Sequence, residues 1–104
     1  MGPVQGQAGG SLAKTYALHD CYPNPARDGV NFAFTLPEAA DVTLEIYDLA
    51  GRRVATPAAG TYRAGDNVVV WTLQADGRRL PAGVYIYSFR AGPYAASKTM
   101  VVAE

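Results

Sequence analysis

Tyr22-Pro23-Asn24-Pro25 is the stretch that decides the fold class. Its two prolines remove backbone donors and favour extended geometry at the residues before them, which excludes both a helix and an interior strand. The stretch is therefore predicted to cross the surface between strands. Further turn signals follow at intervals of roughly ten residues, a spacing typical of an all-β sandwich or barrel. These signals are Leu36-Pro37, Asp48-Leu49-Ala50-Gly51-Arg52, Ala64-Gly65-Asp66-Asn67, Asp76-Gly77-Arg78 and Pro81-Ala82-Gly83.

The segments between the turns are predicted to be strands, and no helix fits among them. Residues 30–36 and 42–47 alternate apolar with polar side chains, which is the two-residue period of a strand with one buried face. The short link at residues 37–39 predicts that these two segments pair as an antiparallel hairpin. Residues 53–55 are expected to form a short strand, followed by a loop through Pro57 and Gly60.

The later segments complete a sandwich. Residues 68–73 are apolar on both faces and contain the only tryptophan, so a central strand is expected, with Trp71 buried near the middle of the core. Residues 84–90, rich in aromatic and β-branched side chains, form a second strand of this kind. With a short segment at 16–20 and a last strand at 96–102, the prediction is an all-β, antiparallel sandwich of about seven strands.

Size and charge narrow the classes of function. The 104 residues predict one domain at residues 15–104, preceded at residues 1–14 by a flexible linker or an expression remnant. Nine basic and nine acidic residues give no net charge, so no nucleic-acid partner is expected. No stretch approaches the roughly 18 apolar residues of a transmembrane helix. The expectation is a small monomeric binding or structural module.

Taken in order, the motifs resemble those of the type A C-terminal sorting domain of type IX secretion, which is related in pattern to the immunoglobulin-like domain of flagellar hook-capping proteins. The resemblance covers residues 16–102 and rests on the order and spacing of the motifs together. It implies an immunoglobulin-like β-sandwich. The motif residues with implied structural roles are Tyr22, Pro23, Asn24, Pro25, Asp48, Gly51, Arg52, Trp71, Gly83, Tyr85 and Tyr87.

The same resemblance implies a function. Domains of this kind direct large exported proteins of Gram-negative bacteria, often hydrolases or adhesins, across the outer membrane and attach them to the cell surface. The chain is accordingly expected to be a non-catalytic, secreted or cell-surface module whose partners are the outer-membrane secretion and attachment machinery. The expected interaction residues lie in the last strand and at the end of the chain: Lys98, Met100, Val102 and Glu104.

Candidate catalytic and metal-binding residues are few. His19 is the only histidine and no serine lies in an elbow motif, so His19 is expected to be a surface residue. No Cys or His pair has metal-ligand spacing and no cofactor is expected, although calcium in a loop between strands stays open. Cys21, the only cysteine, is expected to be a small buried residue. Four aspartates are expected to cap turns with their own side chains: Asp41, Asp48, Asp66 and Asp76.

A second class of function stays open, namely a carbohydrate-binding or spacer module of a secreted polysaccharide-degrading enzyme. Tyr85, Tyr87 and Phe89 are expected to fill the core. Tyr62 and Tyr94, predicted to lie in loops, would then be the surface aromatics. The pairs Arg52-Arg53 and Arg78-Arg79 could dock a surface polysaccharide or form a solvated edge.

Overall fold

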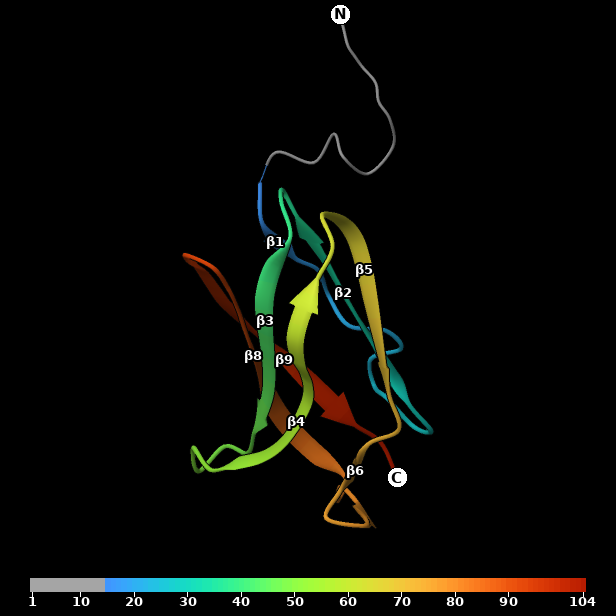
Figure 1. The fold of residues 1–104 in the computed structure, drawn as a ribbon. Coiled ribbons are helices and arrows are strands. Elements are labelled where there is room, and N and C mark those ends of the chain that lie inside the picture. Colours follow the sequence, from blue (N-terminus) through green and yellow to red (C-terminus); the bar gives the residue numbers. More distant parts are fainter. Residues whose placement is uncertain (1–14) are drawn as a thin grey trace, which may run out of the picture.

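The computed structural model describes residues 15–104, and the expected linker or remnant at residues 1–14 lies outside the described residues. The described chain is an antiparallel β-sandwich without a helix, as the sequence predicts (Figure 1). One sheet contains, in spatial order, β1 (Ala17–Leu18), β2 (Val30–Leu36) and β5 (Gly65–Trp71). The other contains β4 (Arg53–Tyr62), β3 (Ala40–Tyr47), β8 (Gly83–Ala91) and β9 (Tyr94–Val102).

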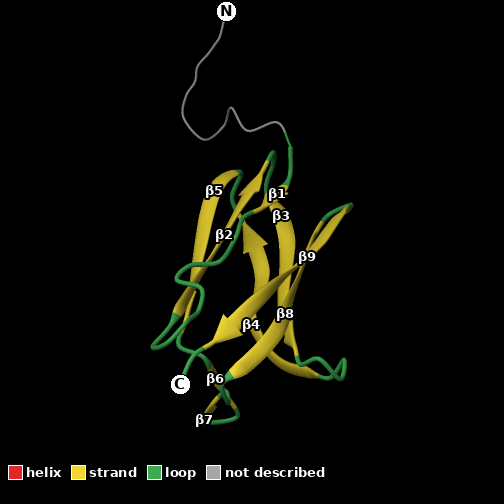
Figure 2. Ribbon diagram, turned by 180° about the vertical axis from the view of Figure 1, so that it is seen from behind, coloured by secondary structure: helices red, strands yellow, loops and turns green. Residues whose placement is uncertain are grey.

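These three-stranded and four-stranded sheets together hold the seven strands that the sequence predicts. A small hairpin of β6 (Gln74–Ala75) and β7 (Arg78–Arg79) is additional and follows β5. Figure 2 shows the long loop between β1 and β2, which passes close to the C-terminal end of β9. Nothing in residues 15–104 forms a helix that could span a lipid bilayer.

The core lies between the two sheets and is built from the alternate residues of the strands. Rings from opposite sheets meet, with centroids 4.9 Å apart for Phe34 and Phe89 and 5.0 Å apart for Phe32 and Tyr87. Tyr85 is buried on the same face of β8, which confirms the prediction that this aromatic series fills the core. Each such side chain stabilises the fold by roughly 1.5–3 kcal/mol through burial alone.

The predicted hairpin between residues 30–36 and 42–47 is wrong. β2 pairs with β1 and β5, whereas β3 pairs with β4 and β8, so residues 37–39 carry the chain from one sheet to the other. The two strands bury their apolar faces against each other from opposite sides of the core. Alternation determines which face of a strand is buried but not which strand is its neighbour, so the sequence fits both arrangements.

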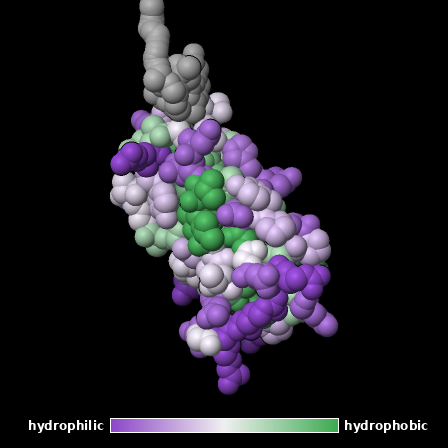
Figure 3. Space-filling view, turned by 90° about the vertical axis from the view of Figure 1, so that its right-hand side faces the viewer, coloured by the Kyte–Doolittle hydropathy of each residue, from purple (hydrophilic) through white to green (hydrophobic). Residues whose placement is uncertain are grey.

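β5 is an edge strand and not the predicted central strand. Among the strands of residues 15–104, β2 is its only hydrogen-bonded neighbour. Val68 and Val70 point away from the core and are 51% and 71% exposed, and Figure 3 shows a hydrophobic patch on this side of the molecule. Trp71 is only half-buried at the end of β5, where its Nε1 donates to the Gln74 carbonyl at 3.2 Å. The second apolar face of β5 is therefore exposed to solvent.

The prediction of a short strand at residues 53–55 followed by a loop is also wrong. β4 runs without interruption from Arg53 to Tyr62. Pro57 and Gly60 both lie within it. β4 is an edge strand, so the missing N–H of Pro57 is not needed by a neighbour on the outer side.

The two aromatic residues expected in loops are also part of strands. Tyr62 ends β4 and Tyr94 begins β9. Both pack on core rings, Tyr62 edge-on against Phe34 and Tyr94 edge-on against Phe89. They are therefore half-buried extensions of the core and do not form a platform for sugar stacking.

Candidate functional site

The segment that follows β1 crosses from one sheet to the other and builds one wall of the candidate site. Tyr22 still belongs to the three-stranded sheet, since its N–H donates to the Asn31 carbonyl at 3.1 Å and its carbonyl accepts from the Asn31 N–H at 2.8 Å. Four residues later, Ala26 forms a parallel bridge with Val102 of β9. Residues 22–26 therefore tie the two sheets together, as the surface crossing predicted from the two prolines would.

Asn24 takes the place of a neighbouring strand along part of β9. Its Oδ1 accepts from the Val101 N–H at 2.9 Å, and its Nδ2 lies 3.5 Å from the Thr99 carbonyl. Ala26 continues this pairing, donating to the Val101 carbonyl at 2.8 Å and accepting from Ala103 at 2.7 Å. The outer edge of β9 is thus covered from Thr99 onward, and the backbone groups there are satisfied without another strand.

The outer edge of the first half of β9 is open. Successive residues of an antiparallel strand direct their N–H and C=O groups to opposite sides, so Ala95 and Ser97 share the outward direction of Val101. In residues 15–104, β8 is the only strand paired with β9, and the bridge to Ala26 lies at its far end. Ala95 and Ser97 therefore present backbone donors and acceptors to solvent.

A cleft opens between the middle of β9, at Lys98 and Thr99, and the crossing segment. It is lined by Asp20, Cys21, Tyr22, Asn24, Lys98 and Thr99. Lys98 lies on the same face of β9 as the buried Met100, and its Nζ is 3.1 Å from Asp20 Oδ1. The side chains are 37% and 90% exposed respectively, so this ion pair is accessible and contributes little stability. A charge that faces inward on an edge strand also opposes unwanted pairing with other chains.

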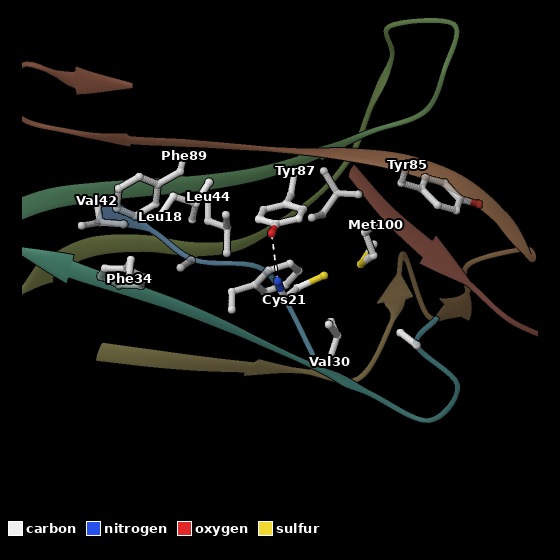
Figure 4. Packing of buried hydrophobic residues seen from close by; sticks show 14 of the residues in the cluster. Leu18, Cys21, Val30, Phe34, Val42, Leu44, Tyr85, Tyr87, Phe89 and Met100 are labelled. Atoms are coloured by element: carbon white, nitrogen blue, oxygen red, sulfur yellow. Dashed lines mark hydrogen bonds between the residues drawn. The ribbon is translucent and has the colours of Figure 1, made fainter. Parts of the chain in front are cut away.

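Cys21, which lines the cleft, is hydrogen-bonded to a buried tyrosine of the core. The Cys21 N–H donates to the Tyr87 hydroxyl at 2.9 Å (Figure 4), and that hydroxyl donates to the His19 carbonyl at 3.0 Å. Burial raises the pKa of the Cys21 thiol and also raises the pKa of the Tyr87 hydroxyl well above its ordinary value. Both groups are therefore neutral near pH 7, and Cys21 is the buried residue that the sequence predicts.

The four residues expected to interact with partners are placed very differently. Lys98 is accessible at the cleft, whereas Met100 and Val102 are buried in the core. Glu104 is exposed, and its backbone carbonyl accepts from Arg27 Nη1 at 2.8 Å. A partner approaching the folded domain can reach the side chains of Lys98 and Glu104 but not those of Met100 and Val102.

The arginine pairs are mostly engaged within the chain. Arg52 Nε lies 2.9 Å from Asp48 Oδ2, and Arg53 Nη1 lies 3.0 Å from Glu45 Oε2. Arg79 Nη2 donates to the Arg27 carbonyl and, at 2.8 Å, to the Ala103 carbonyl, and thereby fastens the end of β9 to the β6–β7 hairpin. These contacts leave little of a shared docking patch.

The remaining motif residues organise turns away from the cleft. Asp48 Oδ1 accepts from the N–H groups of Ala50 and Arg52, each at 3.0 Å, and these bonds hold the pKa of its carboxyl below the usual range. Gly51 completes this turn with a φ of 88°. Gly83 begins β8 opposite Val102, and the Tyr85 hydroxyl donates to the Pro81 carbonyl at 2.7 Å.

His19 belongs to a polar chain on the outer face of the three-stranded sheet. Thr35 Oγ1 donates to Asp66 Oδ1 at 2.9 Å, so the 2.9 Å contact with His19 Nε2 must be donated by the imidazole. Because the hydroxyl proton points to the aspartate, this imidazole cannot act as a base toward Thr35. Within residues 15–104, no three His, Cys, Asp or Glu side chains are grouped so that they could hold a metal ion.

The expectation for the aspartates is correct only in part. Asp48 caps a turn, and Asp76 lies in the turn of the β6–β7 hairpin. Asp41 and Asp66 instead lie in strands, where each carboxylate accepts a hydrogen bond from a cross-strand threonine, Thr61 at 2.7 Å and Thr35 at 2.9 Å. Turn signals lie next to both aspartates in the sequence, and they led to the prediction of turn positions.

Sequence reasoning missed Asp20, Thr99, Arg27 and Arg79 as parts of this region. Their roles depend on contacts between segments more than 20 positions apart, which no local pattern encodes. Asn24 is the residue whose local sequence could have indicated a contact with a distant segment. A polar residue between two prolines has few backbone partners of its own, which leaves its side chain to bond elsewhere.

Comparison with known proteins places the fold in context. The chain matches the FlgD Ig-like domain family over residues 24–93. Among solved structures, it is similar to the crystal structure of dimeric latent PorU from Porphyromonas gingivalis, with a TM-score of 0.70 and 24% sequence identity. That match covers 84% of this chain and only 9% of the PorU chain. No curated protein matches the sequence.

Proposed function

The chain belongs to the FlgD Ig-like domain family, and from this premise we propose that it is a non-catalytic sorting module. In this role it directs a larger exported protein across the outer membrane and attaches that protein to the cell surface, in the manner of the type A domains of type IX secretion. The machinery for secretion and attachment is the partner. The larger protein is proposed to be a secreted hydrolase.

The observation that carries the proposal is the cleft beside Lys98. It joins the residues of the Tyr22-Pro23-Asn24-Pro25 motif to the accessible part of the last strand. Earlier on the same strand, Ala95 and Ser97 offer outward backbone hydrogen-bonding groups, and Lys98 offers a charge within the cleft. A receptor could therefore recognise a folded surface, by strand addition and by charge, without unfolding the end of the chain.

Two further observations support the role of a module. In residues 15–104, the three-stranded and four-stranded sheets pack over one hydrophobic core. The similar region of PorU is a small part of a much longer polypeptide. A domain of this kind can be carried by proteins with different activities.

The test is export of a reporter protein fused ahead of residues 1–104 in a bacterium with type IX secretion. Lys98→Ala should lower the amount of reporter at the cell surface while the free energy of unfolding stays within about 0.5 kcal/mol, because the ion pair is exposed. Asp20→Asn removes the same ion pair but keeps the lysine, so export should persist. Full export of the Lys98→Ala fusion would contradict recognition at this cleft.

Deleting residues 98–104 is a less selective version of the test. It should block export, but it also removes Met100 and Val102 from the core and so destabilises the fold. Full surface display of this truncated fusion would remove the last strand from the signal. The sorting proposal as a whole fails if the intact domain does not bring the reporter to the surface.

A carbohydrate-binding or spacer module is the second candidate, and Tyr22 is the observation that favours it. Its ring is 50% exposed at the rim of the cleft and could stack on a sugar. A pull-down on insoluble polysaccharides separates the two functions. Retention that is lost in Tyr22→Ala would favour sugar binding, and no retention would favour sorting.

A further inference from the structure

The sandwich has four sheet edges, and three of them carry features that oppose pairing with another chain. β1 is only two residues long. β4 contains Pro57 and has register irregularities opposite residues 44–47 of β3. β9 is covered from Thr99 onward by Asn24 and Ala26 and carries the inward Lys98 just before that stretch, so only the short part at Ala95 and Ser97 is open. Short strands, prolines, bulges and inward charges are the usual protection of sheet edges.

The fourth edge, β5, has none of these features. It is seven residues long, and after Gly65 and Asp66 at its start, residues 67–71 contain no charge, proline or glycine. Its outer face carries the exposed Val68 and Val70, on the side where Figure 3 shows the hydrophobic patch. A long edge whose middle and end are apolar and uncharged is the kind that pairs with another strand.

The hydrogen-bonding direction of this edge follows from its neighbours. Asn31 and Ala33 direct their backbone groups toward the β1 side, where they bond Tyr22 and His19. The even-numbered residues of β2 therefore bond β5, through the partners Asn67, Val69 and Trp71. By the same alternation, Val68 and Val70 direct their N–H and C=O groups outward.

We propose that β5 is a self-association edge, at which a second copy of this chain adds its own β5 in antiparallel orientation about a two-fold axis at Val69. In this register Val68 lies opposite the partner's Val70 and exchanges two backbone hydrogen bonds with it, and the symmetric pair repeats the contact. The three-stranded sheets of the two copies join at this edge and form one continuous sheet of six strands.

The chemistry of the edge favours a second copy as the occupant. The register places β-branched side chains opposite one another, a favourable cross-strand pairing. It places Asp66 opposite the partner's Thr72, so a carboxylate faces a hydroxyl and no like charges meet. Moving the axis to Val68 would instead set Asp66 against the partner's Val70. The chain has no net charge, so long-range repulsion does not oppose association.

Disulfide trapping tests the register. Across the axis, Val69 faces its own copy as a non-hydrogen-bonded pair with Cα atoms about 4.5 Å apart, which a disulfide can bridge. In a Cys21→Ala background, Val69→Cys should form a covalent dimer under mild oxidation at low protein concentration. Val68→Cys is the matched control: it is on the same strand and is well exposed, but its Cα lies roughly 8 Å from its own copy, too far for a disulfide. Equal or faster trapping of Val68→Cys would overturn the proposed register.

Light scattering and amide exchange test the association itself. The full chain should show a concentration-dependent doubling of mass, with slower exchange at the Val68 and Val70 amides as the dimer forms. Val70→Lys should weaken association by about tenfold or more, whereas Ile86→Lys, on the outer face of the other sheet, should not. A chain that stays monomeric at high concentration, or a dimer unaffected by Val70→Lys, would overturn the proposal. Protection of these amides by a different added protein, with no doubling of the mass of this chain, would also overturn the proposal.

Discussion

At the scale of single residues, Tyr87 shows how one hydroxyl fixes an irregular backbone. It reaches from β8 across the core and satisfies both the His19 carbonyl and the Cys21 N–H, next to the short strand β1. Tyr87→Phe keeps the ring but leaves the buried Cys21 N–H and the partly buried His19 carbonyl without this partner. We expect the free energy of unfolding to fall by roughly 1–3 kcal/mol in chemical denaturation.

Tyr47→Phe is the matched control for this substitution. Its hydroxyl donates to Glu45 Oε1 at 3.1 Å near the surface, where water can replace it. A change within about 0.5 kcal/mol is expected for a surface substitution of this kind. Equal losses in the two variants would show that the hydroxyl of Tyr87 does not brace residues 19–21.

Sequence reasoning at this scale succeeded where a residue's environment is set by its own strand. The alternation in residues 84–90 correctly predicted that Tyr87 and Phe89 are buried. It could not predict the hydrogen bonds of Tyr87, because their partners lie 66 and 68 positions away. The prediction that Trp71 is buried near the middle of the core was wrong for a related reason. The size of its side chain favours the core, but its strand lies at an edge of the sheet.

At the scale of elements, Asn24 is expected to protect the end of β9. Asn24→Ala removes the acceptor of the Val101 N–H and should accelerate hydrogen exchange at that amide, with a loss of about 1 kcal/mol in unfolding free energy. Asn24→Asp keeps an acceptor oxygen and should retain most of the protection. Unchanged exchange at Val101 in Asn24→Ala would mean that another group covers this edge.

Arg79 provides a second test of how β9 is held. Arg79→Ala should leave the carbonyls of Arg27 and Ala103 without this partner and lower the free energy of unfolding by about 1 kcal/mol. A hydrogen bond from a charged donor is stronger than one between neutral groups, but exposure to water reduces the contribution of these two. Arg78→Ala changes the adjacent exposed arginine and should have no comparable effect. Thermal or denaturant unfolding of the two variants side by side decides the matter.

The elements themselves could be predicted from the sequence far better than their neighbours. Strand positions follow from a period of two, which is visible in residues 30–36 and 42–47. The pairing of those strands depends on the path of residues 37–39 between the sheets, and a short link is compatible with either path. The predicted strand at residues 53–55 ended too early because Pro57 and Gly60 signal a turn. The edge position of β4 allows both residues within a strand.

At the scale of the whole molecule, stability should fall at alkaline pH. Burial raises the pKa of Tyr87 and of Cys21 in the folded state above the values of about 10 and 8.5 found in unfolded chains. Above those values the unfolded state releases protons that the folded state retains, so the free energy of unfolding decreases as pH rises. Denaturant titrations at pH 8 and near pH 10 should show this decrease, and the double variant Tyr87→Phe, Cys21→Ala should show a smaller one. An equal slope in the variant would assign the effect to other groups.

The parallel bridge between Ala26 and Val102 has a mechanical consequence. Residue 15 and the end of β9 lie toward opposite ends of the elongated domain in Figure 1. Tension applied between these points pulls residues 24–26 and β9 in opposite directions along their common axis. The hydrogen bonds of Asn24 and Ala26 to β9 are then loaded together in shear, and they cannot open one after another like a zipper. A domain built in this way resists stretching along its length through the bonds of Asn24 and Ala26, so the crossing that decides its fold also bears mechanical load.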